Sequence, residues 1–478
     1  MTLSRTLRQL LPPLFMLLLT LTGPRSGMAG GQEDKPVLVV TDPEINDLIT
    51  EISKPLLIAA DLDPETVRFH IILNASLNAF ALPNQHIVLH SGLVLAAGSL
   101  DEIAGVMAHE VGHLTAGHHL KLKSTARNAS IKALVISAMG LAAGVASGNH
   151  QLSQAAIIGG QAGAVSEILD DMREKETQSD RLAVGYLQKA GYHPAELATF
   201  LDRISQTQRL TDLPPPYLLT HPVSSQRVME VASLAAETPP LRPHPDLSEE
   251  RLLRVRAKLE AGTGIDPMRA TETFRARLGT VGPENLQGTP GSRFANRYGL
   301  ALALRYAGRL PEALEELAIL MKDRPPDPYL LRERGLIQME RDHLAQAIED
   351  LEAASRLKPD SFDLAYHLAF AQSESGDLTG AASRLRRVIV DHPLEAEAYY
   401  LLGVVEGKRG LMGASHLALA RHHRLNLDRE TALWHYREAV RQFAKGEAGE
   451  ESARDEMERL EKEAVEEERA NKRRRLRH

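Results

Sequence analysis

The chain contains no cysteine, which excludes disulfide bonds, thiolate nucleophiles, sulfur-ligated metal sites and a lipid anchor on cysteine. Any metal bound to it must therefore use histidine and carboxylate ligands. Aromatic residues make up only 4% of the 478 residues, whereas leucine and alanine are abundant, which favours helix over strand. A basic excess is also missing: the formal net charge is -7, so we expect no nucleic acid as a partner.

The N-terminus has the pattern of an export signal. Arg5 and Arg8 precede a mostly apolar run over residues 10–21, and the small residues near Ala29 suit cleavage there. The run is shorter than the roughly 20 apolar residues of a membrane span, which argues against the alternative of an uncleaved anchor. We expect a mature chain that starts near Gly30 and resides in the periplasm.

From about residue 290 the sequence repeats itself with a period of 34 residues. Four independent columns keep this step: Pro325, Pro359 and Pro393; Gly308, Asp342, Gly376 and Gly410; Ala313, Ala347 and Ala381; and Leu317, Leu351, Leu385 and Leu419. The period resembles that of the tetratricopeptide repeat (TPR), whose helix pairs stack into a superhelix with a concave surface. Two roles are possible for the repeats. The common use of such folds favours a surface that binds a protein partner, and the alternative is an array that only stabilises the protein.

The segment Ala-His-Glu-Val-Gly-His carries the strongest chemical signal. In a helix, His109 and His113 lie on one face, at the spacing that two ligands of one tetrahedral zinc require. Glu110 is then placed to take a proton from a metal-bound water. Ser99 and Glu102 have the spacing of a capping box just ahead of this helix. The alternative, which has no chemical function, is a surface helix with two solvated histidines.

A second helical segment supplies a third ligand. Glu176 and Asp180 are again four residues apart, and Glu176 would complete a site with two histidines, one glutamate and an open position for water. Asp180 could accept the free N–H group of a ligand histidine and fix its tautomer. We therefore expect one Zn²⁺ per chain.

Taken together, these motifs resemble the metallopeptidases that include the CAAX prenyl endopeptidase and HtpX. Residues 173–180 match their R-x-x-E-x-x-A-D pattern, with Ser179 in place of the usual alanine. Residues 78–83 also match, as do Gly92-Leu93 and Thr220-His221-Pro222 with Arg227, although Pro83-Asn84-Gln85 departs from the usual P-G-G turn. The resemblance covers roughly residues 40–235.

The resemblance implies a mainly α chain with an α+β zincin-like (gluzincin) metallopeptidase domain, followed by the TPR α-solenoid. It also implies that an edge strand formed by Asn78, Ala79, Phe80, Ala81 and Leu82 pairs with an extended substrate. The export signal and the repeats narrow the resemblance to a periplasmic branch that acts in outer-membrane quality control. That branch assists assembly of β-barrel proteins and degrades those that stall. The implied partners are unfolded or misassembled outer-membrane proteins and, through the repeats, the outer-membrane assembly machinery.

His221 has two possible catalytic roles. The wider family suggests that its imidazole donates to the oxyanion of the tetrahedral intermediate. The repeat-containing branch suggests instead a fourth zinc ligand that displaces the water and latches the enzyme shut, and the neighbouring prolines 214–216 favour this latch. An ordinary loop histidine is the third alternative. His118 is expected to be a packing or surface residue.

The expected organisation is a signal peptide at 1–29, a peptidase domain at 30–236, a linker with connecting helices at 237–289, repeats at 290–443 and a charged tail at 444–478. We expect the tail to be a solvated or frayed helix. Residues 131–146, rich in Ala, Gly and Leu, predict buried or interfacial helices with a possible peripheral membrane contact. The expected function is zinc-dependent endoproteolysis; the alternative is a TPR adaptor or chaperone with a weak or latched protease site.

Overall fold

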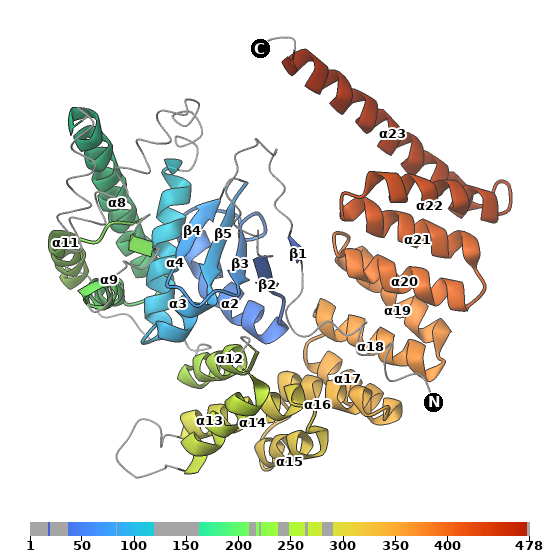
Figure 1. Ribbon diagram of the computed structural model, residues 1–478, viewed down its shortest axis with the longest axis horizontal. Coiled ribbons are helices and arrows are strands. Elements are labelled where there is room, and N and C mark those ends of the chain that lie inside the picture. Colours follow the sequence, from blue (N-terminus) through green and yellow to red (C-terminus); the bar gives the residue numbers. More distant parts are fainter. Residues whose placement is uncertain are drawn as a thin grey trace. The chain divides into compact units, whose positions relative to one another are not determined.

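A small mixed sheet and the helices around it form the first part of the chain in the computed structural model (Figure 1). The structure describes residues 18–19, 37–82, 84–118, 162–209, 217–218, 221–237, 248–262, 266–279 and 290–475. These residues divide into two compact units, Met1–Arg309 and Leu310–His478. The first unit is α+β and the second is helical, so the predicted mainly α fold is confirmed.

The sheet has five strands in the order β1-β2-β3-β5-β4, which places β4 at one edge. The strands are β1 (Leu18–Leu19), β2 (Val37–Val40), β3 (Arg68–Ile72), β4 (Ala79–Leu82) and β5 (His86–His90). β3 and β5 run parallel, whereas the other three pairs are antiparallel. In the β4–β5 pair, Ala79 faces Leu89 and Leu82 faces His86. The segment expected to receive substrate therefore lies at the edge of the sheet.

Helices enclose the sheet and supply most of the core of the first unit. They are α2 (Pro43–Ala59), α3 (Ser91–Ala96), α4 (Leu100–Thr115), α8 (Ala162–Ala190), α9 (Ala195–Arg209), α11 (Ser225–Ala236), α12 (Glu249–Gly262), α13 (Pro267–Gly279) and α14 (Pro290–Tyr306). α4 is the central one, because it contacts α2, α8, α9 and β4. Its residues Ile103, Val106, Met107 and Val111 are fully buried, so α4 is an internal helix and not a surface helix.

The start of α4 follows from its sequence. Ser99 is the N-cap, and its hydroxyl accepts a hydrogen bond of 3.2 Å from the backbone N–H of Glu102. The predicted capping box is only half formed. The Glu102 carboxylate accepts from the backbone of Gly98 at 2.6 Å and pairs with Arg203 instead of closing on Ser99.

Small residues let α4 and α8 approach each other at the level of the proposed site. A Cβ atom added at Gly112 would lie 2.8 Å from the carbonyl oxygen of Ser179. Only glycine fits there without a backbone shift, since real Cβ contacts are longer. Gly112 within the His-Glu-x-x-His segment therefore sets the distance between the two helices that carry the ligands.

The stretch predicted as a linker contains a helix that belongs to the core. Leu252, Val255 and Leu259 of α12 are buried in the same hydrophobic cluster as α4. The ammonium group of Lys258 is fully buried and lies 2.8 Å from Asp42 and 3.2 Å from Glu44, at the start of α2. α12 is thus anchored by apolar packing and by paired buried charges, not merely connecting.

The second unit consists of helix pairs. Its helices are α15 (Leu310–Met321), α16 (Pro328–Glu340), α17 (Leu344–Leu357), α18 (Phe362–Ser375), α19 (Leu378–Asp391), α20 (Ala396–Lys408), α21 (Met412–Leu425), α22 (Arg429–Gln442) and α23 (Ala448–Arg475). The turn column of the 34-residue repeat has positive φ at all four positions: Gly308 at 75°, Asp342 at 62°, Gly376 at 94° and Gly410 at 80°. The alanine column and the first three leucines of its companion column are completely buried. All three columns therefore mark real repeat geometry.

The two compact units divide at residues 309 and 310, and α14 lies in the first of them. The tail is a helix, as expected, and one face of its first half is buried. Ala453 and Leu460 of α23 are buried with Tyr436 of α22 in one cluster, because apolar residues recur at helical spacing among the charges.

Some expectations fall on residues outside the described ranges. The signal peptide does so except for β1, and so do the Pro-rich stretches 214–216 and 239–245 and the segment 131–146. Within the part of the chain that the structure describes, no helix has the length and apolar character to cross a membrane.

Candidate metal centre and active site

α4 presents the His-Glu-x-x-His side chains from within the core of the first unit. His109 is fully buried and Glu110 is 1% exposed. The Nε2 atoms of His109 and His113 lie 3.0 Å apart, as expected for residues one helical turn apart on the same face. Burial excludes the alternative of a surface helix with solvated histidines.

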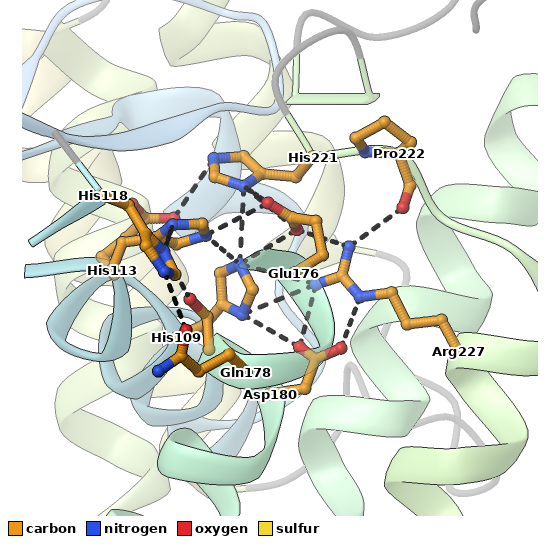
Figure 2. Close-up of polar contacts among 11 residues, drawn as sticks. His109, His113, His118, Glu176, Gln178, Asp180, His221, Pro222 and Arg227 are labelled. Atoms are coloured by element: carbon orange, nitrogen blue, oxygen red, sulfur yellow. Dashed lines mark hydrogen bonds and ion pairs between the residues drawn. The ribbon is translucent and has the colours of Figure 1, made fainter. Parts of the chain in front are cut away.

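α8 brings Glu176 to the same point. One carboxylate oxygen of Glu176 lies 3.3 Å from Nε2 of His109, and the other lies 3.2 Å from Nε2 of His113. Figure 2 shows this carboxylate between the two imidazoles and His221. The helical spacing and the packing of α4 on α8 thus place three donor groups together from segments more than 60 residues apart.

His221 is the fourth member of the cluster. Its Nδ1 lies 3.1 Å from Oε1 of Glu176 and 3.4 Å from Nε2 of His109. One donor atom from each of His109, His113, Glu176 and His221 lies within 4.8 Å of the other three. The side chain expected either as latch or as oxyanion donor therefore lies inside the donor set, at the position where the fourth ligand would bind.

The spacing of the four donors fits one small divalent cation. Tetrahedral coordination with bonds of 2.0–2.1 Å separates neighbouring donor atoms by about 3.3 Å. Five of the six pairs among His109, His113, Glu176 and His221 have donor atoms 3.0–3.4 Å apart, and one donor atom from each residue lies within 4.8 Å of the other three. Three neutral imidazoles and one carboxylate also form a ligand set with the nitrogen and oxygen donors that such a cation prefers.

Buried polar atoms without partners point to the same conclusion. Among the described residues, neither carboxylate oxygen of Glu110 has a hydrogen-bond partner, and Nε2 of His221 has none either. The nearest approach between them, from Oε1 of Glu110 to Nε2 of His221, is 3.5 Å. A buried carboxylate without partners is costly, so Glu110 is suited to a water molecule or substrate group held at the centre.

Asp180 has the predicted relation to a ligand histidine. Its Oδ1 lies 2.9 Å from Nδ1 of His109, on the opposite side of the ring from the donor cluster. Burial alone would lower the pKa of His109, but hydrogen bonds to Asp180 and Glu176 outweigh it and raise this pKa to about 9. Asp180 thus orients His109 with its Nε2 toward the other donors.

Arg227 is a part of the site whose role the sequence did not reveal. Its guanidinium group, buried on α11, lies 2.7 Å from Glu176 and donates two hydrogen bonds, of 2.5 and 2.9 Å, to Asp180. It also donates to the carbonyl oxygen of Pro222 at 3.1 Å, next to His221 (Figure 2). Burial would raise the pKa of Asp180, yet Arg227 and His109 hold it at about 2. Arg227 therefore keeps both carboxylates ionised and fixes the loop that carries His221.

We expect the substitution Arg227→Met to lower the free energy of unfolding by about 3–5 kcal/mol, because it leaves two buried carboxylates uncompensated. Urea denaturation of the metal-free protein measures this change. Arg173→Met is the matched control, since Arg173 pairs with Asp170 on the exposed surface of α8. The control should change stability by less than about 1 kcal/mol. Equal effects of the two substitutions would contradict this role for Arg227.

The expected substrate strand lies beside the centre. Phe80 and Ala81 belong to β4, are partly exposed and lie at the edge of the sheet. Ala79 is fully buried, and Asn78 precedes the strand, with its carbonyl accepting from the backbone N–H of His90 at 2.9 Å. Tyr217 links this end of the strand to the loop of His221: its N–H donates to the Leu77 carbonyl, and its ring lies 4.6 Å from that of His221. The role of residues 78–81 in binding substrate stays a prediction.

A buried helix bearing His-Glu-x-x-His, a glutamate on a second helix and a small mixed sheet define a metallopeptidase. Residues 42–235 match peptidase family M48, and residues 298–362 and 338–404 match tetratricopeptide repeats. The chain is a metalloendopeptidase whose catalytic domain matches family M48 and is followed by tetratricopeptide repeats. The predicted enzyme class is therefore confirmed, and the match of this domain to a metallopeptidase family implies a metal.

The chain is also similar to named proteins. It is 26% identical to the beta-barrel assembly-enhancing protease of Yersinia pestis over 374 residues, which cover 78% of this chain and 74% of that protein. It is 29% identical to a putative beta-barrel assembly-enhancing protease of Vibrio cholerae over 300 residues, which cover 61% of this chain and 58% of that protein. The mitochondrial metalloendopeptidase OMA1 of Saccharomyces cerevisiae is 28% identical over 158 residues, which cover 32% of this chain and 42% of that protein. The similarity to the first protein extends beyond the peptidase domain.

Proposed function

We propose that this chain is a zinc endopeptidase in which Glu110 is the general base. The observation that carries the proposal is the buried Glu110 carboxylate, which lies 3.5 Å from His221, a member of a four-residue cluster that could hold one metal ion. His109, His113 and Glu176 would hold the zinc, which would supply Lewis-acid activation of a water and of the substrate carbonyl. Glu110 accepts the proton of the attacking water and returns it to the leaving amine. β4, which ends the strand order of the sheet, would hold the substrate backbone in an extended form.

His221 is proposed to act as a latch. Its Nδ1 lies 3.1–3.4 Å from donor atoms of Glu176 and His109, so it would take the fourth ligand position that the catalytic water needs. In this arrangement, catalysis requires the loop of His221 to move away. The alternative, donation to an oxyanion, requires the same ring to face a substrate oxygen instead of the donor set.

The proposed substrates are outer-membrane β-barrel proteins. Two of the similar proteins are named beta-barrel assembly-enhancing proteases. We propose that this chain degrades barrel proteins that fail to assemble, assists the assembly of others, and uses its repeats to bind them or the assembly machinery. The position of His221 supports a second candidate function, in which the chain is mainly an adaptor or chaperone and the latched site is silent.

Proteolysis of an unfolded β-barrel protein tests these two functions. The purified enzyme should cleave it, a chelator should stop cleavage, and stoichiometric zinc should restore it. Bovine casein, which is unfolded but forms no barrel, serves as a comparison for substrate class. An enzyme that binds zinc and barrel protein but never cleaves, even when His221 is replaced, would support the adaptor and overturn the endopeptidase.

Removal of residues 310–478 tests the role of the repeats. This cut follows the division between the two compact units, so the first unit keeps its own core. We expect the truncated enzyme to retain its zinc and its cleavage of casein but to lose most of its cleavage of the barrel protein in cells, because recruitment is lost. Normal processing of the barrel protein by the truncated enzyme would contradict recruitment through the repeats.

The proposed location is the periplasm. The motive is the N-terminal pattern of Arg5, Arg8 and an apolar run that precedes Ala29. We expect the exported protein to begin near Gly30, which N-terminal sequencing determines directly. Recovery of an intact Met1 from the cytoplasm would contradict this location.

A further inference from the structure

His118 is buried against the cluster of proposed metal ligands, although no sequence motif includes it. Only 4% of the residue is exposed, and its Nδ1 lies 3.0 Å from Nδ1 of His113. Its other ring nitrogen, Nε2, lies 3.1 Å from Oε1 of Gln178 on α8. Figure 2 shows the three side chains in a row, with His113 nearest the centre. His118 thus differs from the packing or surface residue that the sequence suggested.

The backbone at the end of α4 explains how His118 reaches this position. The helix ends at Thr115, and Gly117 adopts the left-handed conformation with φ of 67°. Glycine takes this conformation without a Cβ penalty and reverses the chain direction after a helix. The residue that follows, His118, is therefore directed back onto the last turn, where His113 lies.

The hydrogen bonds that link His113, His118 and Gln178 can run in two directions, depending on which atom donates. Only one of these directions leaves His113 able to bind a metal. If the Gln178 oxygen accepts from Nε2–H of His118, then Nδ1 of His118 is an acceptor and receives the Nδ1–H of His113. The lone pair of His113 then lies on Nε2, which faces Glu176 at 3.2 Å and His109 at 3.0 Å. The reverse direction would place a proton on Nε2 of His113 and prevent it from binding a metal.

We propose that His118, held by Gln178, is a positioning residue that fixes the tautomer and ring orientation of His113. The inference rests on the proposed metal site. It assigns to His113 what Asp180 provides for His109, whose Nδ1 lies 2.9 Å from the aspartate oxygen. The two histidine ligands therefore have unequal partners, a carboxylate for His109 and a neutral imidazole for His113. Partners of this kind raise the basicity of a ligand and hold its ring in place.

Two substitutions of His118 separate positioning from packing. His118→Leu fills the space but has no acceptor, whereas the side-chain oxygen of His118→Asn occupies about the place of Nδ1. We expect the leucine variant to bind zinc roughly 10–100-fold more weakly than the wild type, and the asparagine variant to recover most of that loss. Equilibrium competition with a chromogenic chelator measures the affinity. The visible absorption bands of the Co²⁺-substituted protein should shift in the leucine variant and return toward wild type in the asparagine variant.

The partner on α8 provides a second, milder pair of variants. Gln178→Leu removes the acceptor for His118, and Glu174→Leu changes an exposed residue of the same helix. The first should weaken zinc binding by less than His118→Leu does, and the second should leave it unchanged. Gln178 is itself exposed, so this pair remains informative if His118→Leu does not fold.

The outcomes distinguish this inference from the proposed function. A wild-type protein that binds no zinc would overturn the metal site itself. A wild type that binds zinc, together with a folded His118→Leu variant of equal affinity and an unchanged Co²⁺ spectrum, would overturn only the role of His118. Equal losses in the leucine and asparagine variants would also overturn it, because they would show that ring packing and not the acceptor matters.

Discussion

Glu110→Gln is expected to abolish peptide hydrolysis while leaving the metal in place. The substitution keeps the size of the side chain but removes its ability to accept a proton, and Glu110 is not one of the four clustered donors. Loss of a general base lowers kcat by roughly 10²–10⁴-fold. The measurement is cleavage of an unfolded protein, compared with zinc content by atomic emission on the same sample.

Two further variants serve as controls for this result. His109→Ala and Glu176→Ala remove donors and should lose both metal and activity. Loss of zinc in Glu110→Gln would show that Glu110 is a ligand. Residual activity near the wild-type level would show that another group accepts the proton.

His221→Ala is expected to raise basal proteolysis, including cleavage of the enzyme itself. The imidazole occupies the fourth position of the donor set, so its removal leaves that position to water. If the open form makes up 10% or less of the wild-type population, removal of the latch raises activity by roughly 10-fold or more. The rate of casein cleavage and the rate of self-cleavage both measure this effect.

The oxyanion alternative predicts the opposite sign. Loss of one oxyanion donor lowers kcat by roughly 10²–10³-fold. Double substitution with Glu110→Gln is the control, because cleavage that persists in the double variant would come from a contaminating protease. A decrease would contradict the latch, and an unchanged rate would make His221 an ordinary loop residue.

The parts of the site that depend on local structure could be predicted from the sequence. His109 and His113, and likewise Glu176 and Asp180, are four residues apart on single helices, so their shared faces follow from helical geometry alone. The 34-residue period similarly predicted the turn positions at Gly376 and elsewhere, because each repeat is a local helix pair.

The contacts between distant segments could not be predicted in this way. Arg227 reaches Asp180 across 47 residues, and His118 reaches Gln178 across 60. Such partners depend on how α11 and the end of α4 pack on α8, which no spacing in the sequence encodes. For the same reason, α12 was expected in a linker: its apolar residues reveal that it is buried only once the core of the peptidase domain is seen.

The central claim is that one zinc ion lies between His109, His113, Glu176 and His221. A crystal of the purified protein measured on both sides of the zinc absorption edge tests it most directly. We predict one anomalous peak per chain, about 2.0–2.2 Å from donor atoms of His109, His113 and Glu176, with His221 as the fourth ligand in the resting enzyme. A zinc-loaded crystal with no peak among these residues, or with a peak held by other side chains, would contradict the claim.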